Sequence, residues 1–245
     1  MLRRFFSARK PASIPPGRRV YAVGDIHGRA DLLERLTAAI AEDAKGANTR
    51  CQIIYLGDYV DRGAETRRVI DLLLTPPAGF EVVYLRGNHD QIMLDFLADP
   101  SVFRLWRDYG ARETLLSYGL TPPRFEDEAA FGEASDRLRE TLPSSHLDFL
   151  TGTRFSVRMG DYAFVHAGVR PGIPLDRQAP EDLMWIREDF LASKADFGAL
   201  VVHGHTPAER PVVRPNRIGI DTGAYATGRL TAAVLEGSSC RFLHT

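Results

Sequence analysis

The stretch CQIIYLGDYVDRG, residues 51–63, joins an apolar run to a turn that holds two aspartates and an arginine between glycines. The apolar run predicts a buried strand. Asp58, Asp61 and Arg62 follow at the point where this strand leaves its sheet. Carboxylates at the edge of a core are costly unless a positive partner meets them. Arg62 can neutralise one carboxylate, so the other one calls for a different partner.

The same change from an apolar run to an amphipathic segment occurs on both sides of this stretch. Strand-like runs occupy residues 18–23 (RRVYAV) and 80–85 (FEVVYL). Helical apolar spacing occurs in residues 29–44, 64–74 and 91–98. Strand–helix alternation of this kind is typical of a parallel sheet with right-handed crossovers.

The last third of the chain is rich in strand-like runs. They are DYAFVHAG (161–168), ALVVHGH (199–205), RIGIDTG (217–223), RLTAAVLEG (229–237) and CRFLHT (240–245). One helical segment, APEDLMWIREDFL (179–191), interrupts them. We therefore predict an α/β (α+β) fold in which a two-sheet β-sandwich is flanked by helices.

One domain is predicted over residues 19–245, after a basic tail at residues 1–18. Six of the 31 basic residues and none of the 32 acidic residues precede Val20, so the rest of the chain is net acidic. The tail contains prolines and is expected to be disordered or loosely docked. Residues from about 99 to 160 read as a mostly helical insertion over one side of the sheet, with no obvious chemistry of its own.

Composition excludes several classes of protein. With 44% apolar and 26% charged residues, the chain is typical of a soluble globular protein. No stretch approaches the roughly eighteen continuous apolar residues of a transmembrane segment. The acidic body argues against a nucleic-acid partner. Cys51 and Cys240 match no metal-binding spacing and indicate a reducing compartment, so we expect a cytoplasmic protein.

The unusual polar residues gather at the ends of the predicted strands. They are Asp25 and His27 in GDIHG, Asn88 and His89 in RGNHD, His166 in FVHAG, and His203 and His205 in VVHGHT. Each motif alone has an ordinary interpretation as a helix cap, a hydrogen-bonded structural histidine or a turn. Ligands bind at the carboxyl ends of strands in open α/β sheets. One shared site therefore explains the pattern better than five coincidences.

The residue types also indicate which metals such a site would hold. Aspartates, an asparagine carbonyl and imidazoles, without thiolates, suit divalent manganese, iron or zinc. The set is too large for a single ion. Two ions a few ångströms apart, bridged by one carboxylate, would be coordinated by the whole set. Such two-metal sites are known to catalyse the hydrolysis of phosphate esters. Asp58 is predicted to lie between the two ions, and these ions are the positive partner that its carboxylate requires.

The five motifs GDIHG, GDYVDRG, GNHD, FVHAG and HGHT, in this order, resemble those of the calcineurin-like metallophosphoesterases. They are most similar to the phosphoprotein phosphatase branch, especially its small bacterial and phage members. The segments WRDYGARETLLSYG and LMWIREDFL also resemble those bacterial members. The resemblance extends from about Arg18 to the C-terminus. One departure from the wider superfamily is that GHTP places Pro207 where many phosphodiesterases and nucleases have a second histidine. The phosphoprotein phosphatase branch shares this absence.

The resemblance implies a role for each motif residue. Asp25, His27 and Asp58 would hold the first metal. Asp58, Asn88, His166 and His205 would hold the second. His89 would be the general acid, oriented by Asp61, and Arg62 and Arg187 would bind the phosphoryl oxygens. His203 is expected to have a supporting or incidental role.

The implied reaction is direct attack on phosphorus by a hydroxide that two divalent ions share, with manganese favoured over iron or zinc. The predicted substrates are phosphoserine and phosphothreonine in proteins, and also phosphotyrosine; a phosphorylated small molecule is another candidate. The alternative is a bis(5'-nucleosyl)-tetraphosphatase (symmetrical) or another nucleotide phosphohydrolase. A third reading, a catalytically inactive phosphoprotein-binding module, is disfavoured because every proposed ligand and the acid are retained. The oligomeric state is left open.

Overall fold

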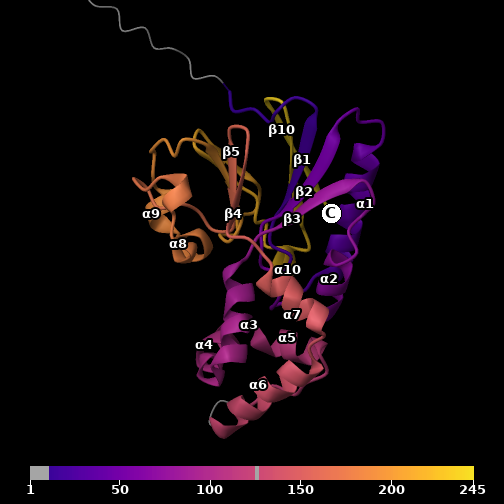
Figure 1. The fold of residues 1–245 in the computed structure, drawn as a ribbon, viewed down its shortest axis with the longest axis vertical. Coiled ribbons are helices and arrows are strands. Elements are labelled where there is room, and N and C mark those ends of the chain that lie inside the picture. The colour runs from indigo at the N-terminus through magenta and orange to yellow at the C-terminus, as the bar shows by residue number, and fades with distance from the viewer. Residues whose placement is uncertain (1–10, 125–126) are drawn as a thin grey trace, which may run out of the picture.

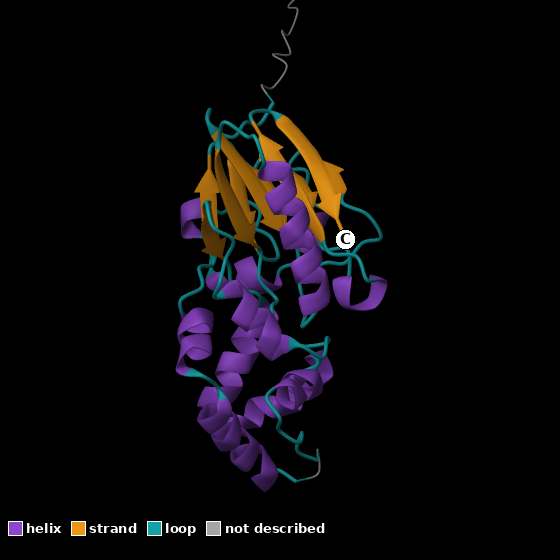
Figure 2. Cartoon of the chain, turned by 90° about the vertical axis from the view of Figure 1, so that its right-hand side faces the viewer, coloured by secondary structure: helices purple, strands orange, loops and turns teal. Residues whose placement is uncertain are grey.

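A computed structural model describes residues 11–124 and 127–245 of the chain as two sheets packed face to face, with helices on both outer sides (Figures 1 and 2). The first sheet has the order β10-β9-β1-β2-β3. Its strands are β1 (Arg18–Val23), β2 (Arg50–Tyr55), β3 (Phe80–Tyr84), β9 (Thr231–Glu236) and β10 (Ser239–His244). The second sheet has the order β4-β5-β6-β8-β7. Its strands are β4 (Ser156–Met159), β5 (Tyr162–Val165), β6 (Leu200–His203), β7 (Val212–Arg214) and β8 (Arg217–Gly219). The predicted α/β sandwich is confirmed.

The central strands β1 and β2 are largely buried on both faces because the first sheet is covered on both sides. In β1, Val20 and Ala22 lie in the core between the two sheets, whereas Tyr21 and Val23 lie in the core beneath the helices. Side chains alternate between the faces of a strand, so a doubly covered strand is apolar throughout. This burial explains why β1 and β2 read as largely apolar runs.

Helices cover both outer faces of the sandwich. On the first sheet, α1 (Ala30–Ala44) and α2 (Thr66–Leu73) bury leucine, isoleucine and valine side chains at helical spacing. On the second sheet, α8 (Pro180–Trp185) and α9 (Glu188–Leu191) contribute Leu183 and Phe190 to a core with Val165 and Val201. A 3-10 turn, η3 (Leu175–Arg177), precedes α8.

The helical insertion extends beyond one end of the sheets instead of lying over one side (Figures 1 and 2). It follows α3 (Asn88–Ala98). Its elements are η1 (Pro100–Val102), α4 (Phe103–Trp106), η2 (Arg107–Tyr109), α5 (Ala111–Ser117), α6 (Ala129–Thr141) and α7 (Ser144–Thr151). The helical part therefore ends at Thr151, earlier than the predicted boundary near 160, because β4 belongs to the second sheet.

The segment just before β1 is packed against the body of the protein. The Ile14 side chain is 1% exposed in the core between the sheets, and its backbone N–H donates to the Gly237 carbonyl at 2.8 Å. The described part of the predicted tail, residues 11–17, is therefore docked, and residues 1–10 lie outside the described residues. Within the described ranges, no helix has the length and apolar character needed to cross a bilayer.

The parallel strands bring their carboxyl ends to one edge of the sandwich. Strands β1, β2 and β3 are mutually parallel, and so are β5, β6 and β8. Each of these six strands is followed directly by a motif singled out above or, for β8, by Asp221 in DTG. The helix α3, which leads into the insertion, begins at this same edge, so the edge lies between the two sheets and the inserted helices.

Candidate metal centre

The strand-end residues converge on two overlapping groups of buried side chains. His27, Asp58 and His89 form one group, and Asp58, His166 and His205 form the other. Within each group, the nitrogen and oxygen atoms that could bind a metal lie within 4.8 Å of one another. Asp58 belongs to both groups, which is the arrangement expected of a carboxylate between two ions.

Three imidazoles surround one oxygen of Asp58. Asp58 Oδ2 lies 3.5 Å from His27 Nε2, 3.4 Å from His166 Nε2 and 3.9 Å from His89 Nε2. Burial alone would raise the pKa of Asp58, but the histidines, His166 first, lower it below its usual value. Asp58 is therefore an anion at neutral pH, as a metal ligand must be.

The backbone fixes which ring nitrogen faces the cluster. His27 Nδ1 lies 3.0 Å from the Val60 carbonyl, and His166 Nδ1 lies 2.9 Å from the Leu56 carbonyl. A carbonyl only accepts, so each Nδ1 carries the proton and each Nε2 keeps its lone pair. Burial lowers the pKa of His27 to about 3, and burial also lowers the pKa of His166. Both rings are therefore neutral and suited to binding a metal.

The side chain of Asn88 completes the second group. Its Oδ1 lies 3.0 Å from His166 Nε2 and 2.9 Å from His205 Nδ1. The helix α3 begins at Asn88, three residues earlier than the apolar spacing indicates, so Asn88 and His89 lie in its first turn. This early start points both side chains toward the end of β2.

Two buried polar atoms in the site, Asp25 Oδ1 and His205 Nε2, lack a hydrogen-bond partner among the described residues. The other oxygen of Asp25 accepts from the His205 backbone N–H at 2.9 Å. Burial, then the charges of Asp221 and Asp58, raise the pKa of Asp25 well above its usual value. A buried carboxylate of this kind needs a cation. The donor set of oxygens and imidazole nitrogens fits divalent metals.

His89, a member of the first group, also forms a hydrogen-bonded pair with Asp61. His89 Nδ1 lies 2.8 Å from Asp61 Oδ2, and both side chains are buried. Burial lowers the pKa of His89, but the charge of Asp58 and the contact with Asp61 outweigh it, so the net pKa is raised. The remaining ring nitrogen, Nε2, faces the cluster and lies 3.4 Å from an Arg62 nitrogen.

The two predicted phosphate-binding arginines are both exposed. The Arg62 guanidinium stacks over the ring of Tyr225, 4.5 Å from its centroid. Arg187 lies at the N-cap of α9. After the larger effect of burial, its charge contributes to lowering the pKa of His166 and His205.

Backbone strain is concentrated in this site. The non-glycine residues with positive φ among the described residues are His27, Asp58, Asp61, Arg62 and His205. All five are predicted site residues. The left-handed region is unfavourable for residues with a Cβ, and such strain persists where function requires it. Gly87 and Gly204 complete the close fit, since a Cβ at either position would lie 2.0 Å from Asp58 Oδ1 or Asp25 Oδ1, respectively.

The structure adds residues that sequence reasoning missed. Asp90 accepts the backbone N–H groups of Asp58, Tyr59 and Gly87, each at 2.9 Å, and so holds the β2 and β3 loops together. Its position in the motif GNHD is the sequence feature that could have identified it. Asp221, in DTG after β8, is buried next to Asp25, and its position after an apolar run could have identified it.

Two further residues bear on the extent of the site. Tyr225, in α10 (Ala224–Thr227), packs edge-on against His27 with ring centroids 5.4 Å apart, and no sequence pattern indicated this contact. His203 instead packs against Phe190, with centroids 5.0 Å apart, and belongs to neither ligand group. The sequence prediction placed His203 outside the ligand set.

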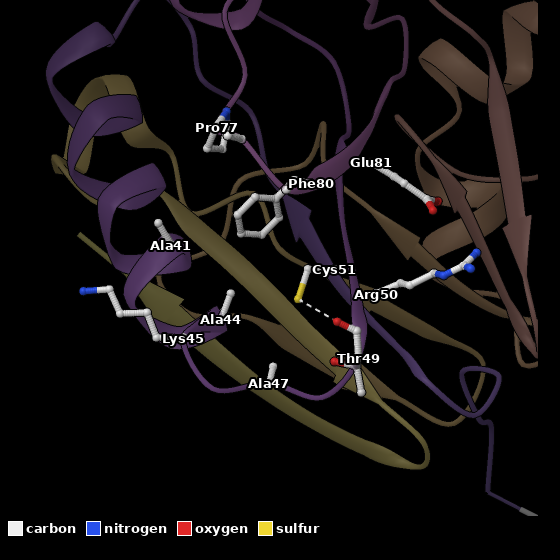
Figure 3. Close-up of a pocket in the computed structure, with 12 residues that line it drawn as sticks. Ala41, Ala44, Lys45, Ala47, Thr49, Arg50, Cys51, Pro77, Phe80 and Glu81 are labelled. Atoms are coloured by element: carbon white, nitrogen blue, oxygen red, sulfur yellow. Dashed lines mark hydrogen bonds between the residues drawn. The ribbon is translucent and has the colours of Figure 1, made fainter.

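A cavity of about 810 Å³ lies elsewhere, near the amino-terminal ends of β2 and β3. Figure 3 shows its lining, which includes Lys45 at the end of α1, Cys51 of β2 and Phe80 of β3. None of the predicted site residues lines it. The candidate centre is therefore at the opposite end of the strands from this cavity.

Comparison with known proteins identifies relatives along nearly the whole chain. The family model for calcineurin-like phosphoesterases matches residues 18–233. The chain is 25% identical to a bis(5'-nucleosyl)-tetraphosphatase PrpE [asymmetrical] of Anoxybacillus flavithermus, over 86% of this chain and 87% of the relative. It is 29% identical to serine/threonine-protein phosphatase 1 of Salmonella typhimurium, over 89% and 93% of the two chains.

The fold has relatives among solved structures as well. One crystal structure, of a protein provisionally described as a diadenosine tetraphosphatase, matches with a TM-score of 0.61 at 22% identity. The match covers 95% of this chain and 98% of the other. At this identity the likeness concerns the fold. Because the family model spans most of the sequence, the chain belongs to the calcineurin-like phosphoesterase family.

Proposed function

We propose that the protein is a metal-dependent phosphomonoesterase that hydrolyses phosphoserine and phosphothreonine in proteins, and phosphotyrosine as well. Asp25, His27 and Asp58 hold one divalent ion. Asp58, Asn88, His166 and His205 hold the other, and manganese is the metal that we expect first. When bound, the ions supply Lewis acidity, which makes a water molecule an effective nucleophile near neutral pH.

The protein's own groups have separate tasks in this proposal. Arg62 and Arg187 bind the phosphoryl oxygens, for which planar guanidinium groups are well suited. The stacking of Arg62 on Tyr225 limits the positions of its guanidinium before substrate binds. His89 Nε2 gives a proton to the leaving oxygen, and Asp61 accepts the hydrogen bond from His89 Nδ1.

The observation that carries the proposal is the buried His89–Asp61 pair facing the metal groups. An alkoxide such as that of serine is a poor leaving group, so its ester needs a proton donor. A nucleotide phosphate is a much better leaving group and depends less on such a donor. A raised His89 pKa and a fixed ring orientation are therefore most useful for alkyl monoesters.

A second candidate function is hydrolysis of a dinucleoside tetraphosphate. The relative from Anoxybacillus, named as an asymmetrical tetraphosphatase, supports it, and so do other relatives with that name. This differs from the symmetrical cleavage considered from the sequence. The same ligands and arginines would serve either substrate, so the leaving group distinguishes the two candidates.

Manganese-loaded protein is expected to hydrolyse a phosphoserine peptide with a higher kcat/KM than diadenosine tetraphosphate. The measurement is released phosphate for the peptide and separated nucleotides for the dinucleotide, at equal metal and protein concentrations. A preference of several orders of magnitude for the dinucleotide would overturn the protein phosphatase assignment and support the second candidate. If the protein hydrolysed neither substrate, both candidate functions would be ruled out.

A further inference from the structure

The helical insertion contacts the carboxylate of Asp61 through two side chains. Trp106, the last residue of α4, donates its indole N–H to Asp61, with Nε1 3.0 Å from Oδ1 and 2.9 Å from Oδ2. Thr114, in α5, donates its hydroxyl to Asp61 Oδ1 at 2.7 Å. All three side chains are 0% exposed. These contacts link the insertion, in which the sequence shows no obvious chemistry, to the candidate site.

The hydrogen bonds to Asp61 fix the plane of its carboxylate. Oδ1 accepts from Thr114 and Trp106, whereas Oδ2 accepts from Trp106 and from His89 Nδ1. The Asp61 backbone N–H donates in turn to Thr114 Oγ1 at 2.9 Å. Burial raises the pKa of Asp61, and the hydrogen bonds from His89, Thr114 and Trp106 oppose that rise. Every side-chain partner donates, which is the pattern that an ionised carboxylate requires.

A backbone contact docks the insertion on the same turn. Gly110, between η2 and α5, has φ +111, and a Cβ there would lie 2.6 Å from the Arg62 backbone nitrogen and 3.2 Å from Asp61 Cβ. Both the conformation and the close approach exclude a side chain at Gly110. The insertion is thus held against the DRG turn between Trp106 and Thr114.

We propose that Trp106 and Thr114 are positioning residues for proton donation by His89, which makes the helical insertion a working part of the active site. The inference rests on the proposed phosphomonoesterase function. The proton passes from His89 Nε2 to the leaving oxygen, while Asp61 keeps Nδ1–H bonded and the ring oriented. Without the two donors from the insertion, the Asp61 carboxylate can rotate, and the imidazole loses the alignment on which proton transfer depends.

The test uses three variants at the two positions. Trp106→Phe removes the indole N–H but keeps an aromatic side chain. Thr114→Val removes the hydroxyl at nearly constant shape, and Thr114→Ser restores it. Phe131→Leu is the matched control, because Phe131 is buried in the same core and makes no hydrogen bond to Asp61. Thermal melting checks that each variant folds.

We expect kcat for an alkyl monophosphate to fall about tenfold in Trp106→Phe and in Thr114→Val, the loss typical of one hydrogen bond to a charged group. With p-nitrophenyl phosphate, whose leaving group needs little protonation, we expect the fall to stay within about threefold. Thr114→Ser and Phe131→Leu should keep the wild-type ratio of the two rates. Equal losses on both substrates would overturn the inference, because a purely structural role lowers both rates alike.

A second measurement does not depend on activity. In metal-free protein at fixed pH, the proton NMR signal of His89 Nδ1–H is expected far downfield because of its bond to Asp61. It should move upfield or broaden by exchange with water in Thr114→Val and return in Thr114→Ser. An unchanged signal in Thr114→Val and Trp106→Phe would contradict the inference even if the wild type hydrolysed neither ester. Wild-type inactivity with the expected NMR changes would instead overturn the proposed function alone.

Discussion

Replacing Asp58 with asparagine is expected to strip the protein of bound metal and reduce phosphoesterase activity at least about 100-fold, since even residues that only support metal ligands cost 10–100-fold. Asparagine keeps the shape of the side chain and an oxygen that can accept the His89 backbone N–H, now at 3.0 Å. It removes the negative charge that three imidazoles surround. Metal content after desalting and kcat under saturating manganese are the measurements.

An exposed aspartate provides the control for that variant. Asp136, on α6, pairs with Arg139 at 2.6 Å at the surface and lies in neither ligand group. Asp136→Asn should bind as much metal as the wild type. If Asp58→Asn also kept both ions and its activity, Asp58 would not bridge them.

Replacing His89 with asparagine is expected to reduce turnover of alkyl phosphates by about 10² to 10⁴, the usual contribution of a proton donor. Metal binding should survive, because none of the proposed metal ligands is changed and the contact of residue 89 with Asp58 Oδ1 is made by the backbone. Turnover of p-nitrophenyl phosphate should fall far less. The comparison of kcat on the two substrates, with metal content measured in parallel, tests this expectation.

His203 offers the matched control for His89. It is also a buried histidine at a strand end, yet its ring packs against Phe190 and its Nδ1 lies 3.0 Å from the Gly204 carbonyl. His203→Asn should leave the ratio of alkyl to aryl turnover unchanged. If His89→Asn lowered kcat equally on both substrates, His89 would not be the proton donor.

The sandwich and the convergence of the strand-end residues could be predicted because burial and topology produce recognisable sequence patterns. Strands covered on both faces are apolar throughout, as in residues 51–56, and parallel strands bring their carboxyl ends to one edge. The short strands β4 and β7 show no continuous apolar run, because their residues are exposed or half-buried. Ile14 stands alone among prolines and polar residues, so its docking between the sheets had no periodic signal.

The residues that support the candidate site were harder to predict than the strand-end residues. Trp106 is 45 residues from Asp61 along the chain, and only the path of the insertion brings the two together. Tyr225 likewise depends on the short helix α10 to reach Arg62. The five left-handed residues are polar or charged, and nothing in their identity reveals a strained φ. The local sequence pattern therefore predicts which residues are buried and where the motifs lie, whereas contacts between distant residues depend on the assembled fold.

The most direct test of the metal centre is anomalous scattering from crystals grown with ample manganese. We predict two anomalous peaks about 3.5–4 Å apart, as in other two-metal sites. Asp58 should lie between them, with His27 beside one peak and His166 and His205 beside the other. The absence of peaks from this edge of the sandwich, with these side chains bonded only to one another, would contradict the account.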